Sequence, residues 1–430
     1  MILAWLMWGR TLQLVIALSA AGAALVMLRY LAVSAVLAGF IAVAGFGYFV
    51  PSSTSAFMAG TLFILLIRKL ITGRLKWRLG TFIIPVGLFI TYYQISALWV
   101  DQTNFFHWHP ILRVLPAIIV ISELVSSTKQ YLMVFIGCAI GMTFTSVSAI
   151  RSAAEFYSSG VADQLAGTVQ SIETSRFFGH WPDPNIMSMT LTAFLGGVIG
   201  LWRSSISFPL RMLMLVATIT SIAAVLMSLS RAGLISCTIV IIMMLAIERK
   251  RFAIFAAVGL VVATLLLILP IDIFGRLESM LAGSDTSSSE RLALLTSGWK
   301  MFWQNPLFGA GMGGFENGVL YILPYLSQGV FAHNTVVDLA VDGGVIAVML
   351  FAICLFFAFR GLSWSDWRID RSDMSARINA GLRAGLTGSI VSMLTISSAT
   401  YVPFWILFTL CAMYASSLKS GNRIQQVVSA

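Results

Sequence analysis

Apolar runs of about twenty residues recur along almost the whole 430-residue chain, separated by short polar loops. A transmembrane α-helix needs about 20 consecutive apolar residues to cross the ~30 Å hydrocarbon core of a bilayer. The sequence therefore predicts an all-α polytopic membrane protein with about 12–13 transmembrane helices, forming a single transmembrane domain over residues 1–430. The candidate spans are 11–28, 31–50, 54–70, 80–99, 111–126, 131–149, 184–202, 207–229, 232–247, 252–270, 335–358, 384–400 and 403–417.

The composition supports this class, because 58% of the residues are hydrophobic and only 10% are charged. Soluble domains have about 45–50% apolar and about 25% charged residues. The N-terminal stretch has no small-residue cleavage site after a short apolar core, so we expect it to belong to the first span. All four cysteines lie inside apolar runs, which predicts core thiols rather than a disulfide framework or a metal site. They are Cys138, Cys237, Cys354 and Cys411.

The formal charge of +10 arises largely from short basic clusters between apolar runs, chiefly in 68–78, 248–251 and 360–383. Such clusters follow the positive-inside rule for cytoplasmic loops, and they argue against nucleic acid as a partner. An even number of predicted spans separates these loops, so all of them fit on the cytoplasmic side. The opposite, outer face then receives the loops 150–183 and 271–333.

The outer loop 271–333 contains a predicted amphipathic helix at 286–306, in TSSSERLALLTSGWKMFWQNP. Serine hydroxyls at 287–289 and Glu290 suit its first turn, and Pro306 ends it. We expect this helix to lie along the membrane surface, with its charged side chains on another face. Its apolar stripe comprises Leu292, Leu295, Trp299 and Phe302.

Histidines and arginines on the predicted outer face are the most informative polar residues, because the positive-inside rule works against arginines there. Arg231, in VLMSLSRAGLISCT, lies at the outer end of a helical hairpin without a charged neighbour. Either its side chain reaches lipid phosphate, or its guanidinium binds an anionic substrate such as a phosphate. The full outer set is His107, His109, His180, His333, Arg151, Arg176, Arg231, Arg276 and Arg291.

Polar residues cluster in FAHNTVVDLAVDGG, residues 331–344, at the start of a predicted span. His333 is either a packed residue at a helix start or a proton acceptor near neutral pH. Asn334 can cap the following helix. Asp338 and Asp342 then share one helix side with Asn334, and we expect them to point into the protein and pair with an outer arginine.

Three other motifs have structural explanations. GAGMGG at 309–314 matches G-x-G-x-x-G, but it follows an amphipathic helix rather than a strand, which excludes a dinucleotide site. His107 and His109, with His180, have the residue types of a metal site, although their aromatic neighbours favour an interfacial belt. HWPDPN at 180–185 predicts a rigid turn that leads into a span.

Three segments together resemble the bacterial O-antigen ligase and polysaccharide polymerase family of membrane glycosyltransferases. They are the SRAG turn at 230–233, NPLFGAGMGGF at 305–315 and AHNTVVDLAVDGGVIAVMLF at 332–351. PDPN at 182–185 is similar to another recurring feature of the family. The resemblance implies a GT-C-like, all-helical fold in the bacterial inner membrane, with a long periplasmic loop and a periplasmic active site.

The resemblance also implies a reaction, the transfer of a glycan from undecaprenyl diphosphate to a sugar hydroxyl. Arg231 and His333 match the functional arginine and histidine of the family motifs, and Arg291 is the best match for a further outer-loop arginine. In this interpretation His333 is the general base, and the two arginines stabilise the departing diphosphate. No metal or other cofactor is then expected. Further candidates for substrate binding are Arg276, Arg176, Asn334 and Asp338.

The sequence departs from the family in two respects. The span count is odd where members usually have an even number, and Asp342 stands where a glutamate usually precedes the glycine. The acceptor is either a second lipid-linked repeat, as in a polymerase, or lipid A–core, as in a ligase. A polymerase is favoured, because nothing identifies a lipid A–core site. The rival classes are a transporter or flippase of an anionic amphiphile and a metal-dependent enzyme built on the outer histidines.

Overall fold

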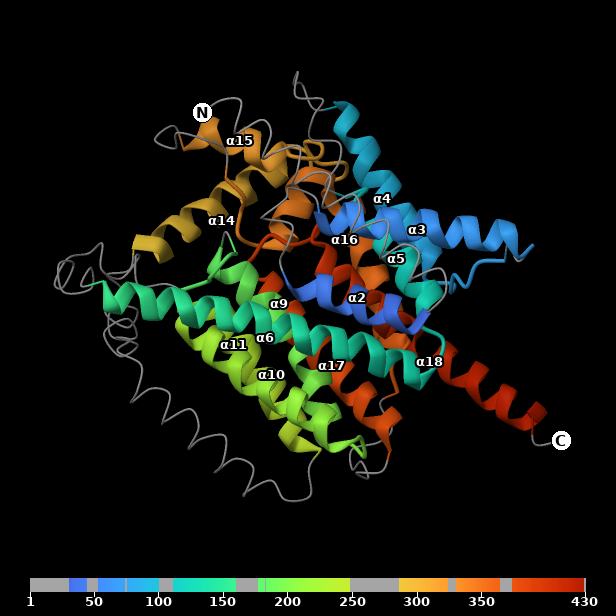
Figure 1. The fold of residues 1–430 in the computed structure, drawn as a ribbon. Coiled ribbons are helices and arrows are strands. Elements are labelled where there is room, and N and C mark those ends of the chain that lie inside the picture. The colour runs from blue at the N-terminus through green and yellow to red at the C-terminus, as the bar shows by residue number, and fades with distance from the viewer. Residues whose placement is uncertain are drawn as a thin grey trace, which may run out of the picture.

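A computed structural model describes residues 31–44, 53–73, 76–99, 111–159, 177–181, 183–247, 286–323, 330–363 and 373–428. All the regular elements in these ranges are helices (Figure 1). The predicted spans 11–28 and 252–270 lie outside the described residues. Each of the other predicted spans corresponds to a helix, which confirms the all-α class.

The described helices include four that are long and apolar enough to cross a membrane, α6, α9, α10 and α16. Several shorter helices, such as α4 and α5, are also apolar. The prediction of a polytopic membrane protein is therefore confirmed. In chain order the elements are α2 (Leu31–Ala44), α3 (Ser53–Ile71), α4 (Ile83–Ser96), η2 (Ala97–Trp99), α5 (Val114–Leu124), α6 (Thr128–Ser158), α9 (Pro184–Trp202), α10 (Phe208–Met227), α11 (Arg231–Ala246), α14 (Thr286–Gln304), α15 (Gly314–Ile322), α16 (Thr335–Arg360), α17 (Met374–Met393) and α18 (Val402–Val428).

Helix α9 lies at the centre of the bundle, and most of its residues are buried. It packs along α17, α10 and α11. Small residues permit the closest approach: a Cβ on Gly385 of α17 would lie 2.1 Å from the Ala193 carbonyl oxygen of α9. Close contact of backbones through small residues is typical of helix pairs in membranes. The start of α9 is consequently held in a fixed place among its neighbours.

Helix α17 corrects one predicted span and one predicted loop. The helix covers Met374–Met393, whereas the span was predicted at 384–400, and residues 374–383 were assigned to a cytoplasmic loop. Arg377 and Arg383, counted as loop cations, are only 2% and 6% exposed within the bundle. A prediction from hydropathy does not assign a segment with two arginines to a span. It takes no account of arginine side chains that are buried against other helices. Asp373 caps this helix by accepting a hydrogen bond from the Ala376 N–H (3.0 Å).

Helix α6 also extends beyond its prediction. It continues past residue 149 to Ser158, so part of the predicted outer loop 150–183 is helical. Arg151 and Glu155 form an exposed ion pair one turn apart (2.7 Å). This pair explains locally why an arginine is tolerated at this end of α6.

Helix α14 confirms the predicted amphipathic helix and ends two residues before Pro306. It packs on α15 and α16 at one edge of the bundle (Figure 1). Its buried face differs from the predicted stripe, because Leu292 and Trp299 are 66% and 60% exposed. Leu294 and Met301 instead join a small core with residues of α15 and α16.

Candidate functional site

The start of α16 is fixed by hydrogen bonds from Asn334 and Thr335. The Asn334 Oδ1 accepts from the N–H groups of Val336 (3.0 Å) and Val337 (3.2 Å), which confirms the predicted N-cap. Its Nδ2 donates to the Leu394 carbonyl (2.9 Å), and the Thr335 hydroxyl donates to the carbonyl of Ile396 (2.6 Å). These bonds hold the turn before α16 against the segment that follows α17.

His333 itself has a left-handed backbone, with φ of 51°. This conformation is uncommon for a residue other than glycine, and it persists only where the surroundings impose it. Asp338, buried one turn into α16, accepts a hydrogen bond from the Ala332 N–H (2.9 Å). The carboxylate therefore holds the backbone directly before His333 and helps fix the direction of the imidazole.

Charged groups from two other helices act on the partly buried His333 ring. Burial lowers the pKa of His333 below its ordinary value of 6.5, and the positive charge of Arg291 lowers it further. The negative charges of Asp183 and Glu290 oppose this shift. Because the net shift is downward, the imidazole is mainly neutral at pH 7 and can accept a proton.

Asp183 belongs to the start of α9. Its carboxylate accepts from the N–H groups of Asn185 (2.7 Å) and Ile186 (2.9 Å), and Pro184 occupies the first helical position. An acidic cap followed by proline is a strong helix start. A span therefore begins at Pro184 as predicted, and its cap brings a carboxylate close to His333.

The start of α11 lies against the start of α9. Leu229 has a left-handed φ of 48°, and Ser230 then caps the helix through the Gly233 N–H (3.2 Å). The Ser230 hydroxyl also donates to the Asn185 Oδ1 (2.7 Å). Arg231 follows directly as the first residue of α11, so its backbone is held beside the N-terminus of α9.

The N-termini of α9, α11 and α16 thus meet at one end of the bundle, where Glu290 and Arg291 of α14 also lie. A helix N-terminus carries a partial positive charge and attracts anions. We call the charged residues at this place the N-terminal cluster: Asp183, Arg231, Glu290, Arg291 and His333. It joins three residues that the sequence singled out separately, and it can bind an anion while a neutral imidazole accepts a proton.

Asp342 has a different function from Asp338. Its carboxylate accepts hydrogen bonds from the Tyr93 hydroxyl (2.6 Å) and from the N–H groups of Gly313 (3.1 Å) and Phe315 (2.9 Å). An arginine was the expected partner of both aspartates, whereas the described partners are backbone N–H groups, a tyrosine and, for Asp338, the side chain of Ser397. No sequence signal indicated Tyr93, which lies about 250 residues away along the chain.

The glycine-rich segment 305–315 packs backbone to backbone against α16. Gly311 N–H donates to the Asp342 carbonyl (2.7 Å), and Val345 N–H donates to the Pro306 carbonyl (2.9 Å). Gly344, with φ of 65°, kinks α16 at the contact, and a Cβ there would lie 2.2 Å from the Leu307 carbonyl oxygen. The glycines therefore serve close backbone contact.

The remaining candidates are less informative. Arg276, Arg176, His107 and His109 lie outside the described residues. His180 makes a 2.6 Å hydrogen bond through Nε2 with the Ala44 carbonyl, which ties the end of α2 to the turn before α9. Within the described part of the chain, no group of three histidines, cysteines or acidic residues is placed to hold a metal ion.

The fold and site define a helical membrane protein with a charged, histidine-containing polar site at one end of its bundle. Residues 189–352 match the family model described as O-antigen ligase. This match confirms the resemblance predicted for the chain and supports a transferase function of the O-antigen ligase and polymerase type. It runs from α9 to α16 and includes Arg231, Arg291 and His333. No curated protein matches the chain significantly.

Proposed function

We propose that this protein is an inner-membrane glycosyltransferase that works at the periplasmic face. It transfers a glycan from undecaprenyl diphosphate to the hydroxyl of a second lipid-linked repeat, as a polysaccharide polymerase. One observation carries the proposal: His333 lies partly buried and close to Arg291 at the meeting point of helix N-termini, where burial and the arginine charge lower its pKa. The transfer requires groups that bind the diphosphate and a base, and we assign both to the N-terminal cluster.

The reaction follows from the cluster. The acceptor hydroxyl gives its proton to the neutral His333 ring as its oxygen attacks the anomeric carbon. The bond between that carbon and the diphosphate oxygen breaks, and its electron pair leaves with undecaprenyl diphosphate. Arg231, Arg291 and the helix N-termini stabilise the charge that develops on this oxygen. A single displacement of this kind inverts the anomeric centre.

The two arginines also make a metal ion unnecessary in this proposal. A guanidinium pairs with phosphate oxygens through parallel N–H donors and keeps its charge at all relevant pH values. Arg231 and Arg291 come from different helices, so they can hold the diphosphate from two sides. Glu290 and Asp183 offset the positive charge of the two arginines at this place.

An apolar cavity beside the cluster supports a lipid-linked donor. It has a volume of about 220 Å³ and lies between α14 and α16, next to the helix start that follows His333. Trp299 and Val345 on its walls are exposed at the surface of the bundle. An isoprenoid chain placed there leaves its diphosphate near the N-terminal cluster. The lining residues are Leu295, Gly298, Trp299, Phe302, Val336, Val337, Ala340, Val345 and Val348.

A reconstituted assay tests this proposal. Purified protein in liposomes receives an undecaprenyl-diphosphate oligosaccharide, with and without lipid A–core and with and without a chelator. We expect glycan chains to grow without lipid A–core and regardless of the chelator. Transfer only to lipid A–core identifies a ligase with the same cluster. Loss of activity with the chelator contradicts the metal-independent mechanism, and translocation without transfer indicates a transporter.

A further inference from the structure

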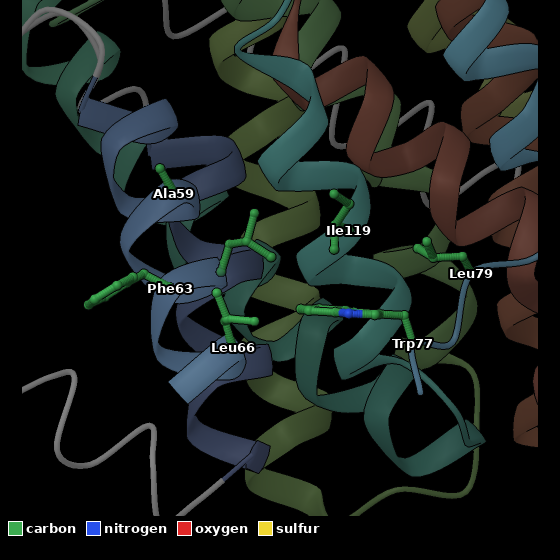
Figure 2. Close-up of a pocket in the computed structure, with 7 residues that line it drawn as sticks. Ala59, Phe63, Leu66, Trp77, Leu79 and Ile119 are labelled. Carbon is green, nitrogen blue, oxygen red and sulfur yellow. The ribbon is translucent and has the colours of Figure 1, made fainter. Parts of the chain in front are cut away.

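A larger cavity lies between α3 and α5 (Figure 2), and its lining includes no residue of the N-terminal cluster. Its volume is about 410 Å³, and nearly all of its lining is apolar. Phe63 is 62% exposed, so the cavity opens at the side of the bundle, where lipid surrounds a membrane protein. The lining residues are Ala59, Leu62, Phe63, Leu66, Trp77, Leu79 and Ile119.

Lys69 holds one wall of this cavity. Its ammonium group pairs with Glu123 of α5 (3.0 Å), donates to the Lys76 carbonyl (2.6 Å) and lies 4.8 Å from the centre of the Trp77 ring. The backbone N–H of Arg78 bonds to the same Glu123 carboxylate. These contacts fix the segment 76–79 against α5 and place the Trp77 ring at the edge of the cavity, as Figure 2 shows.

The rim next to Trp77 is cationic. Lys76 and Arg78 are exposed on either side of the tryptophan. Arg68, close to the end of α3, has a buried Nη1 that makes no hydrogen bond within the described residues. Tryptophan with lysine and arginine at a helix end is typical of the membrane–water boundary, so an apolar cavity here meets a basic rim at headgroup level.

We propose that this cavity binds one anionic phospholipid. One acyl chain occupies the space between α3 and α5, and the headgroup phosphate pairs with Lys76 and Arg78. Basic pockets between transmembrane helices bind anionic headgroups by this chemistry. The cavity has room for only about one turn of an α-helix, because a helix with its side chains is about 10–12 Å in diameter. Its volume therefore suits a lipid chain rather than a partner helix.

Native mass spectrometry of the full-length protein tests the proposal with phosphatidylglycerol and phosphatidylcholine. We expect one phosphatidylglycerol to stay bound after detergent exchange, with phosphatidylcholine bound far more weakly. Neutralising the rim with Lys76→Gln and Arg78→Gln lowers the affinity for phosphatidylglycerol by about fivefold for each cation removed. Arg360→Gln, which removes an exposed cation at the end of α16, is the matched control and leaves the affinity unchanged.

The apolar part of the site is tested separately. Ala59→Phe fills the cavity and displaces the lipid, whereas Ile242→Phe on the exposed face of α11 does not. A photo-crosslinking residue at position 63 is expected to label lipid. Equal binding of both lipids, or full affinity in the rim and filling variants, overturns the proposal. Crosslinking of position 63 mainly to protein also overturns the proposal, because it identifies a partner helix or a second copy of this chain as the occupant. Melting temperatures establish that each variant is folded.

Discussion

Replacing Asp338 with leucine removes the acceptor that holds the backbone before His333. The Ala332 N–H that donates to this carboxylate is buried, so the variant leaves it without its partner. An unsatisfied buried donor costs about 1–3 kcal/mol, and the left-handed backbone of His333 costs about 1–3 kcal/mol. We expect the turn to relax toward an ordinary conformation and to withdraw the imidazole from the acceptor.

The expected magnitude follows from these energies. If the variant must recover the productive turn in each turnover, kcat falls by roughly 10- to 100-fold, because about 1.4 kcal/mol corresponds to tenfold in rate. KM stays near the wild-type value, since Arg231 and Arg291 still bind the diphosphate. Glycan transfer in liposomes gives both constants, and a melting curve confirms that the variant is folded.

Asp338→Asn is the matched control. Its amide oxygen can still accept from Ala332 N–H, so kcat remains within roughly threefold of wild type, as expected when a neutral acceptor replaces a charged one. A folded Asp338→Leu protein with wild-type kcat refutes the positioning argument. An asparagine variant as impaired as the leucine variant shows instead that the negative charge matters.

Two further changes test the site and its scaffold. The lowered pKa of His333 predicts that kcat/KM is lost as the pH falls below about 6.5, because the neutral base is needed. In rate–pH profiles, the pH at which half of kcat/KM is lost is expected to rise in Arg291→Gln and to fall in Glu290→Gln. Shifts of both variants in the same direction contradict the assigned charges. Gly344→Ala places a Cβ against the Leu307 carbonyl oxygen at a residue with positive φ, and this backbone conformation alone costs at least about 1–2 kcal/mol for alanine. Calorimetry is expected to show a lower Tm for the variant. An unchanged Tm argues against this backbone contact.

Much of the fold follows from local sequence. Apolar runs predict the existence of α9, α10 and α16 because a bilayer-spanning helix must be apolar along its length. Asp183 and Asn334 are helix caps whose effect depends only on the next few residues, so their positions were predictable. The amphipathic helix α14 was predicted for the same reason, although the face that packs on α16 was not.

Other features depend on contacts that local patterns do not encode. The span of α17 was wrong because Arg377 and Arg383 are buried by other helices, whereas hydropathy treats them as loop residues. The bond between Asp342 and Tyr93 joins distant parts of the chain. The left-handed backbone of His333 is likewise imposed by tertiary contacts. The sequence thus singled out three members of the cluster, Arg231, Arg291 and His333, but neither its acidic members nor how the residues are held.

The central claim is that His333 accepts the proton of the acceptor hydroxyl. The most direct measurement is single-turnover glycan transfer by His333→Ala with saturating undecaprenyl-diphosphate oligosaccharide, alongside donor binding by the same protein. We expect the rate of transfer to fall by about 10²–10⁴-fold while the donor is bound with wild-type affinity. Transfer at the wild-type rate by the folded variant contradicts a base at His333.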